Sequence, residues 1–484
     1  MVSDGAKSGA NGNARMKVIA PLLLFAISAL HAADTQLPAG VRSALDLRHV
    51  PAETLSIYVA DLDSGQIVLN WRGDVPRNPA STMKVLTTLA ALDILGPTYR
   101  WRTDVFVQGD LKAGRLEGDL LIKGHGDPFM VTERVWQMLR NIRRAGINEI
   151  SGDLLIDDSW FEVDDYDPAA FDRQPLRAYN VAPNALLMNF KVVRYHFEPD
   201  LLTNTVVVSL EPPLKNLRVQ NRLHLVAGRC RGFQRGITIT TNMPLDEVTF
   251  SGNFPGGCTQ YSLDRSALSH NDYVYGLFRS LWLESGGVFS GGWRNVVIEK
   301  SLQPILSFES LPLGEIIASV NKHSNNVMAR NLLLTLAAEV NGYPGTEESG
   351  IQVISKWLVD NKLESDEIVI ENGAGLSRKV RITAKHMGAL LKYAWRQPYM
   401  PEYLASLSLA GLDGSLKERF TDAGLVGRAR LKTGSIDHVT AIAGYLQSRT
   451  GRRFAVVVLQ NHPDIHRGPG EEVQDALLRW LYEQ

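Results

Sequence analysis

The sequence of 484 residues has few of the features that mark the commonest classes of functional site. It contains two cysteines, and no Cys or His residues stand at the spacing of a zinc site. It has no glycine-rich phosphate-binding loop and no dinucleotide-binding fingerprint. The formal net charge is −1, so charge gives no support for a nucleic-acid partner. The sequence therefore implies no metal and no cofactor, and we expect no nucleic acid to bind.

The apolar segment near the N-terminus is too short for a comfortable transmembrane span. Residues 18–30 are apolar, follow Met16-Lys17 and precede Ala32-Ala33. A basic start, a short apolar stretch and small residues are typical of a secretory signal peptide. We therefore expect residues 1–33 to be a leader and signal peptide, with Met16 as the true start. An uncleaved membrane anchor is the alternative.

The two cysteines, Cys230 and Cys258, both lie in loop-like surroundings rich in glycine. In an oxidising compartment they would form one disulfide that closes a loop of about thirty residues, worth about 3–4 kcal/mol by the chain-entropy estimate. Two free thiols are the alternative.

The hydrophobic content of 44% and the charged content of 21% are typical of a folded protein, and the length exceeds that of one ordinary domain. Alternating apolar residues predict two strands before a helix that runs to about Leu95. The next two hundred or so residues are largely β in pattern. The predicted elements are strands 54–60 and 66–71, a helix at 132–145, helices 314–322, 326–340, 350–361 and 383–395, a strand at 368–371, strands 428–433, 440–446 and 453–459, and a helix at 471–482.

The order of these elements predicts an α/β (α+β) fold. We expect residues 34–98 and 302–484 to form one domain, with an antiparallel sheet flanked by helices. Residues 99–301 would be a large β-rich insertion of one or two domains. No catalytic cluster is visible in the insertion.

The first chemical motif is Ser81-Thr-Met-Lys84, which opens an apolar helical run. Residues three apart share one face of a helix, so Lys84 can reach the hydroxyl of Ser81. The first helical turn also presents free N–H groups and a positive dipole end to charge that forms on the serine. A neutral Lys84, its pKa lowered by burial, could serve as the base. The pattern recurs at Ser319–Lys322, inside a helical run, where we interpret it as an ordinary chance match.

Two later motifs could complete such a site. Ser324-Asn-Asn326 falls at a break between two predicted helices, where side chains can point into a cleft; a helix cap is the alternative. Lys432-Thr433-Gly434-Ser435 ends a predicted strand. Its lysine and hydroxyls can bind a carboxylate, and its glycine lets a substrate approach the strand edge. A surface lysine at a turn is the alternative.

Together and in this order, the three motifs are those of penicillin-binding proteins and class A β-lactamases. The chain resembles the penicillin-binding protein 4 type of D-alanyl-D-alanine carboxypeptidase/endopeptidase, the low-molecular-mass class C group. Ser81 and Ser324 are 243 residues apart (324 − 81), as this group's inserted domains imply. Further segments are similar to the group: 116–128, 182–186, 371–378 and 410–416.

The resemblance implies a transpeptidase-like domain and a peptidoglycan DD-peptidase in the periplasm, with Ser81 as nucleophile, Lys84 as base and Ser324 as proton donor to the leaving amine. It implies that the substrates are stem peptides ending in D-Ala-D-Ala or D-Ala–diaminopimelate cross-links, that β-lactams inhibit, and that there is no integral membrane anchor. The implied substrate-binding residues are Asn326, Lys432, Thr433, Gly434 and Ser435.

Two departures from the group concern the substrate's side chain. Asn325 stands where Asp is commoner, and Asn189 stands where relatives often place an acidic residue near the cleft. Arg378 is a further candidate near the site. The alternatives in function are a non-catalytic peptidoglycan-binding protein on the same fold or, against the long gap between the motifs, a β-lactamase.

Overall fold

The computed structural model describes residues 36–163, 166–230, 236–242, 246–259, 261–299, 301–421 and 424–484. The predicted leader and signal peptide, residues 1–33, lies outside these ranges. Within them, no helix combines the length and the apolar character that crossing a bilayer requires.

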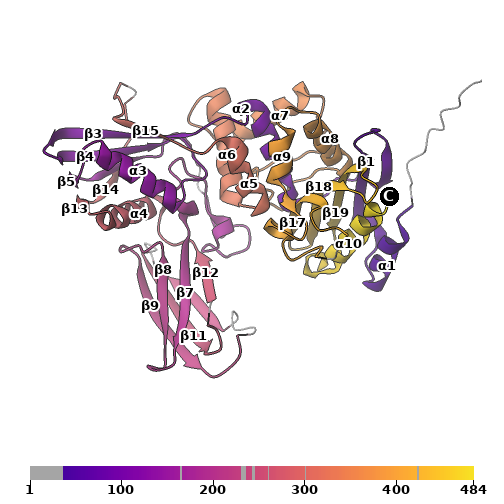
Figure 1. The fold of residues 1–484 in the computed structure, drawn as a ribbon, viewed down its shortest axis with the longest axis horizontal. Helices are drawn as coiled ribbons and strands as arrows, with labels where there is room; N and C mark the ends of the chain where they lie inside the picture. Colours follow the sequence, from indigo (N-terminus) through magenta and orange to yellow (C-terminus); the bar gives the residue numbers. More distant parts are fainter. Residues whose placement is uncertain are drawn as a thin grey trace, which may run out of the picture.

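A six-stranded antiparallel sheet joins the two ends of the chain. The N-terminal hairpin enters it through β1, which pairs with β19 over its whole length. Figure 1 shows this junction as indigo β1 beside the yellow C-terminal strands. The sheet contains the predicted strands near residues 54, 66, 428, 440 and 453. In spatial order its strands are β16 (Ser408–Leu409), β17 (Ala429–Ile436), β18 (Val439–Gln447), β19 (Arg453–Asn461), β1 (Leu55–Asp61) and β2 (Ile67–Trp71).

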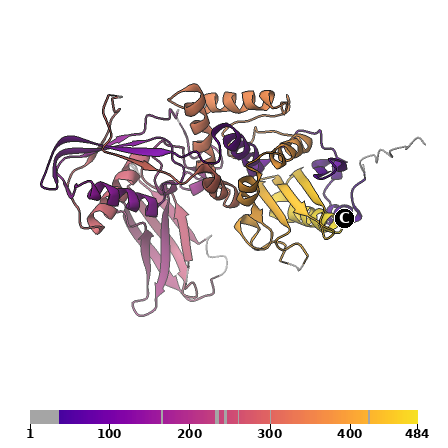
Figure 2. The same ribbon diagram turned by 45° about the horizontal axis from the view of Figure 1, so that its top comes forward.

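Helices cover both faces of this sheet because its central strands are apolar on both sides. Along β19, Val457 and Leu459 belong to one buried cluster, whereas Val456 and Val458 belong to another. The first cluster packs against helices α2 (Lys84–Leu95), α5 (Leu313–Lys322), α6 (Asn326–Asn341), α7 (Glu347–Asp360), α8 (Ala384–Trp395) and α9 (Met400–Ser406), and the second against α1 (Ala39–Leu47) and α10 (Pro469–Tyr482). Figure 2 shows the helices around the sheet. The predicted α/β fold with a helix-flanked antiparallel sheet is confirmed.

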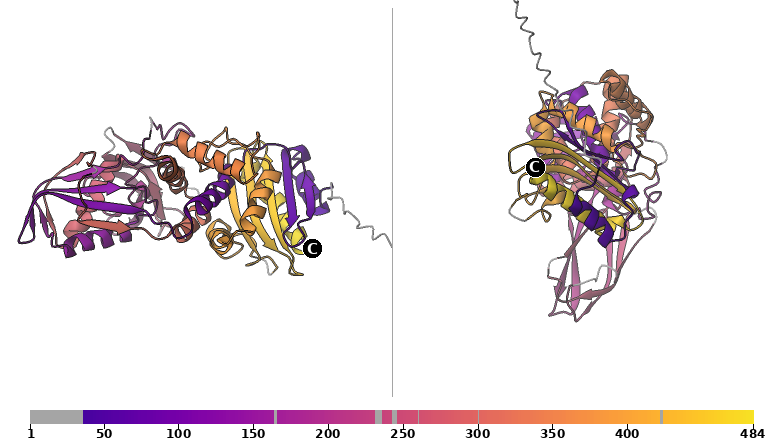
Figure 3. Two further views of the ribbon diagram at one scale, coloured as in Figure 1. Left: turned by 90° about the horizontal axis from the view of Figure 1, so that it is seen from above. Right: turned by 90° about the vertical axis from the view of Figure 1, so that its right-hand side faces the viewer.

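Residues 102–309 form a second region beside this one, and the two give the molecule its elongated outline in Figure 3. Its largest sheet has β13 (Val288–Phe289), β5 (Glu149–Ile150), β4 (Arg115–Gly124), β3 (Arg102–Lys112) and β15 (Leu306–Glu309), with β6 (Leu154–Asp157) and β14 (Trp293–Asn295) attached. Helices α3 (Thr132–Arg144) and α4 (His270–Glu284) pack on it. Two smaller sheets hold β12 (Tyr261–Arg265), β7 (Val193–Asp200) and β8 (Thr205–Glu211), and β10 (Ile237–Thr241), β11 (Glu247–Pro255) and β9 (Arg218–Val226).

One buried cluster links all three sheets of this region. It includes Ile122 of β4, Phe197 of β7 and Phe250 of β11. Cys230 and Cys258 form a disulfide across a separation of 28 residues, at the far end of the smaller sheets.

The structure differs from the sequence prediction in two places, and a third prediction stays open. Helix α4 was not predicted, because its 15 residues include His, Asn, Asp, Gly and several aromatic side chains, all of weak helix propensity. Burial of Leu277, Phe278 and Trp282 outweighs this weak propensity. The strand predicted at 368–371 is wrong: only an isolated bridge between Val369 and Arg381 forms there. Strand β15 begins after residue 301, the predicted end of the insertion, and yet it pairs with β3. The boundary at residue 301 therefore stays a prediction.

Candidate active site

Ser81 lies in a 3-10 turn, η2 (Ala80–Met83), immediately before α2. The sequence predicted it in the first turn of a helix ending near Leu95; α2 does end at Leu95, but it starts at Lys84. Ala80 has a positive φ of 45°, a backbone strain of about 1–3 kcal/mol. The turn presents the half-buried Ser81 at the entrance of the apolar helix.

Lys84 is fully buried and donates three hydrogen bonds to neutral oxygens. Its Nζ lies 3.0 Å from Ser81 Oγ, 2.7 Å from Asn326 Oδ1 and 2.6 Å from the carbonyl oxygen of Ala374. Burial lowers the pKa of Lys84 well below its usual value, and the positive charges of Lys432 and Arg330 lower it further. A lysine with a lowered pKa gives up its proton more readily than an exposed one, and its neutral form can then accept a proton from the serine hydroxyl.

The Ser324–Asn326 segment connects α5 to α6 and brings two side chains to the lysines. Ser324 has a φ of 53°, and its Oγ accepts a hydrogen bond of 2.9 Å from Lys432 Nζ. Asn325 caps α6, because its side chain accepts from the backbone N–H of Met328. Asn326 accepts from Lys84 and donates to the carbonyl of Tyr179 at 3.2 Å. The middle residue is therefore the cap, and its two neighbours face the site.

Lys432 comes from β17 and is also fully buried. Its Nζ donates to Ser324 Oγ and, at 2.7 Å, to the carbonyl of Thr433. Burial lowers the pKa of Lys432 to about 7. The Thr433 hydroxyl donates to Ser415 Oγ at 2.7 Å, while Ser435 is exposed at the strand edge.

Gly434 allows β17 to lie directly against the turn that carries the serine. A Cβ at this position would lie 2.6 Å from the carbonyl oxygen of Pro79 and 3.0 Å from the backbone nitrogen of Ser81. The absence of a side chain thus sets the distance between the third motif and Ser81. All three motifs therefore meet in one place, although they are far apart in the sequence.

The other candidates lie outside this cluster. Ser319 is inside α5, and Lys322 pairs with Asp413 at 2.6 Å, so the second Ser-x-x-Lys pattern is structural. Arg378 pairs with Asp437 at 3.3 Å and stacks on Phe171.

Asn189, the second departure from the group, lies in the region formed by residues 102–309. Its side chain donates to the carbonyl of Val192 and to the hydroxyl of Tyr273. It also lines the groove that contains Ser324.

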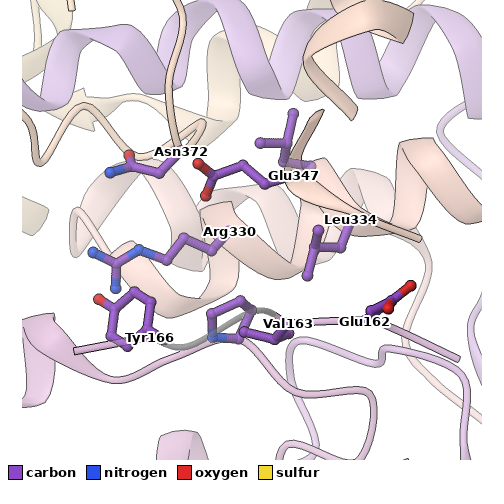
Figure 4. A pocket seen from close by; sticks show the side chains of 9 residues that line it. Glu162, Val163, Tyr166, Arg330, Leu334, Glu347 and Asn372 are labelled. Atoms are coloured by element: carbon purple, nitrogen blue, oxygen red, sulfur yellow. The ribbon is translucent and has the colours of Figure 1, made fainter. Parts of the chain in front are cut away.

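Sequence reasoning missed Arg330, which lies one turn after Asn326 on α6. It is only 4% exposed and donates through Nη1 to the carbonyls of Tyr179 at 3.2 Å and Val181 at 2.7 Å. The sequence did contain a signal for this residue, namely an arginine within a largely apolar helical segment. Figure 4 shows its guanidinium beside Tyr166, with Glu347 and Asn372 across a cavity of about 200 Å³. Arg330 thus places a positive charge behind Lys84 and Asn326.

Comparison with known proteins identifies the family. The profile of the D-Ala-D-Ala carboxypeptidase 3 (S13) family matches residues 39–484. The chain belongs to this family. The resemblance proposed from the three motifs is confirmed, and with it the assignment to the serine-type peptidases.

Relatives in this family span most of the chain. The D-alanyl-D-alanine carboxypeptidase of Actinomadura sp. (strain R39) is 27% identical over 452 residues, which cover 88% of this chain and 81% of the relative. The D-alanyl-D-alanine carboxypeptidase DacB of Haemophilus influenzae is 22% identical over 406 residues, 83% of this chain and 84% of the relative.

The crystal structure of penicillin binding protein 4 (dacB) from Haemophilus influenzae superposes with a TM-score of 0.76 at 20% identity, over 92% of this chain and 99% of that one. A second crystal structure of that protein, complexed with a β-lactam, has a TM-score of 0.71 at 20% identity and covers 89% and 96% of the two chains. These likenesses establish the fold.

Proposed function

We propose that this family member is a peptidoglycan DD-peptidase in which Ser81 forms an acyl-enzyme with the penultimate D-Ala of a stem peptide. The observation that carries the proposal is the hydrogen bond from Lys84 Nζ to Ser81 Oγ, which is 3.0 Å long. The Lys84 side chain that makes it is fully buried. We also propose the periplasm as its location, reached through the signal peptide, without an integral membrane anchor.

Acylation would begin with proton transfer from Ser81 Oγ to neutral Lys84. The serine oxygen attacks the carbonyl carbon of the penultimate D-Ala, or of the D-Ala in a D-Ala–diaminopimelate cross-link. The C–N bond then breaks, and the leaving amine takes a proton from Ser324. Lys432, whose Nζ donates the 2.9 Å hydrogen bond to Ser324 Oγ, replaces that proton. Water hydrolyses the ester and restores Ser81.

Binding of the substrate would use groups that surround these three residues. The backbone N–H groups of Ser81 and Ser435 would stabilise the oxyanion. Asn326 would hold the substrate amide, and the charge of Lys432 with the hydroxyls of Thr433 and Ser435 would hold the terminal carboxylate. Gly434 supports this arrangement because it keeps the strand next to Ser81.

The proposal also includes the domain organisation of the chain. Residues 34–98 and 302–484 would form the serine acyl-transferase domain, and residues 99–301 would be an insertion. The supporting observation is that the six-stranded sheet takes all its strands from residues 55–71 and 408–461.

The test is the mass of the intact protein after incubation with benzylpenicillin, followed by peptide mapping. We expect one adduct per chain, on Ser81, and slow release. Ser81→Ala should remove the adduct without unfolding the protein, because the side chain is half-buried and small. Labelling that persists in the folded Ser81→Ala variant would contradict the assignment, and rapid turnover of a chromogenic cephalosporin would instead indicate a β-lactamase.

A further inference from the structure

The cavity beside Arg330 is separate from the place where substrate is proposed to be cleaved. Its walls come from residues 162–183 of one region and from α6, α7 and the loop at Asn372 of the other. Among the described residues, none of those proposed to bind or cleave substrate lines it. Its volume of about 200 Å³ is below the usual size of a drug-sized site and suits a small molecule.

The closed end of the cavity carries a positive charge that no protein carboxylate neutralises. Arg330 is buried, and both of its hydrogen bonds to carbonyl oxygens use Nη1. Within the described ranges it forms no ion pair, and its Nε has no hydrogen-bond partner. The Tyr166 ring lies 5.3 Å from the guanidinium carbon, and Figure 4 shows the Tyr166 hydroxyl beside the guanidinium. This end therefore favours an anionic group such as a carboxylate.

The open end of the cavity carries the opposite charge. Glu347 and Glu162 both line the cavity and are exposed to solvent. In the part of the chain that the structure describes, neither carboxylate forms an ion pair. Figure 4 shows Glu347 across the cavity from Arg330, with the apolar side chain of Leu334 also on the wall. Negative charge at the entrance repels a simple anion and attracts an ammonium group.

We propose that this cavity binds the zwitterion of a small amino acid, with its carboxylate at Arg330 and Tyr166 and its ammonium group at Glu347. The D-Ala that the proposed function releases is such a molecule. The binding site is inferred from the cavity alone, whereas the regulatory role described next rests on the proposed function.

Two contacts connect the cavity to the base of the reaction. Burial lowers the pKa of Lys84, and the positive charges of Lys432 and Arg330 lower it further. A carboxylate bound at Arg330 would offset that residue's part, so less Lys84 would be neutral at a given pH. Asn372 also accepts at 3.1 Å from the N–H of Ala374, whose carbonyl accepts from Lys84. Released D-Ala would thus slow the next acylation.

The binding site can be tested while the active site is blocked, by NMR titration of the penicillin-acylated protein with three small molecules. D-Ala has both charges, D-lactate has a hydroxyl in place of the ammonium group, and D-alaninamide has no carboxylate. We expect D-alaninamide to bind at least tenfold more weakly than D-Ala, because it loses the partner of a buried cation. D-lactate should bind about fivefold more weakly, since Glu347 is exposed and its attraction is screened.

Glu347→Gln should weaken D-Ala about fivefold and should not weaken D-lactate. Glu348→Gln is the matched control, because it makes the same change on the next residue, which is exposed, bonds to Gln352 and does not line the cavity. It should leave the affinity for D-Ala unchanged.

The regulatory role predicts a change in the pH profile of acylation. Saturating D-Ala should move the acidic limb of the penicillin acylation rate to higher pH and leave the rate at high pH unchanged. Competition at Ser81 would instead slow acylation at every pH and would be overcome by more penicillin.

Binding of D-Ala that disappears when Ser81 is acylated would overturn the cavity assignment, because the amino acid would then occupy the active site. D-lactate that binds as tightly as D-Ala, or equal losses in Glu347→Gln and Glu348→Gln, would overturn it as well. Protein that forms no penicillin adduct would instead refute the proposed function, and the same titrations of the unmodified protein and its Glu347→Gln variant would still test the cavity.

Discussion

At the scale of single residues, the site is built on two buried lysines without a carboxylate partner in the described ranges. Lys84 and Lys432 donate only to hydroxyl, amide and carbonyl oxygens. A buried ammonium that lacks a counter-ion is costly, so its pKa falls. The lowered pKa serves the chemistry, because the neutral form of a lysine is a base.

Arg330 provides a test of this electrostatic arrangement. Arg330→Gln removes a positive charge that lowers the pKa of Lys84, so that pKa should rise and less Lys84 should be neutral at a given pH. We expect the acidic limb of the penicillin acylation rate to move to higher pH. Acylation should therefore slow several-fold on that limb and keep its rate at high pH, where Lys84 is neutral in both proteins.

Arg330→Lys keeps the charge and should leave the limb in place. Arg330 also holds the carbonyls of Tyr179 and Val181, so a purely structural role would lower the rate equally at every pH. Stopped-flow acylation between pH 5 and 10 distinguishes the two roles.

The sequence could predict the residues whose side chains form recurrent motifs, and the structure brings Ser81, Lys84, Ser324, Asn326 and Lys432 together; their roles stay predictions. It could not predict Ala374, which contributes a carbonyl oxygen and has no side-chain signature. Nor could it predict the hydrogen bonds of Arg330, because they depend on where segment 178–181 packs against α6.

At the scale of elements, the contact between β17 and the 3-10 turn η2 determines the geometry of the site. The strand brings Lys432 and Ser435, the turn brings Ser81, and Gly434 lies between them. Neither element alone could form the proposed oxyanion hole.

Gly434→Ala should therefore separate the two elements. Its Cβ would meet the backbone of Pro79, Ser81 and Thr82 at 2.6–3.0 Å, and backbone atoms cannot move away cheaply. We expect the acylation rate to fall about 10²-fold, the typical effect of a misplacement near 1 Å, with little loss of secondary structure. Gly40→Ala is the matched control, because its Cβ meets only Ala476 at 3.9 Å. An unchanged rate in Gly434→Ala would show that the strand and the turn are not in tight contact.

Elements with strong periodicity were predicted well, and those that depend on tertiary burial were not. Helix α8, for example, was predicted at 383–395 and spans Ala384–Trp395, and its cap is Thr383, whose side chain accepts from His386 N–H. Two elements were not predicted correctly. Helix α4 is stabilised by burial in the core of the second region, and residues 368–371 form no strand because they lack a neighbouring strand.

At the scale of the whole molecule, separate hydrophobic cores stabilise the two regions. The six-stranded sheet has its own clusters on its two faces, whereas the three sheets of residues 102–309 share another. The disulfide Cys230–Cys258 belongs to the second region, and Cys258 is buried there.

Loss of this disulfide should destabilise one region only. We expect Cys230→Ser with Cys258→Ser to lower the stability of the 102–309 region by about 3–4 kcal/mol. Calorimetry should show one transition moved to lower temperature and the other unmoved, with penicillin acylation of Ser81 unchanged in rate. A loss of acylation in the folded variant would mean that the region of residues 102–309 controls the reactive serine.

The pairing of β1 with β19 has a consequence for the biosynthesis of the enzyme. The strand that precedes Ser81 has β2 and β19 as its partners, and β19 lies close to the C-terminus. Lys432 likewise follows Ser81 by 351 residues (432 − 81). During synthesis, Ser81 is therefore made long before β19, the partner strand of β1, and long before Lys432. Under the proposed mechanism, we expect a chain that is cut short before β19 to be inert toward a β-lactam, because β1 then lacks this partner strand.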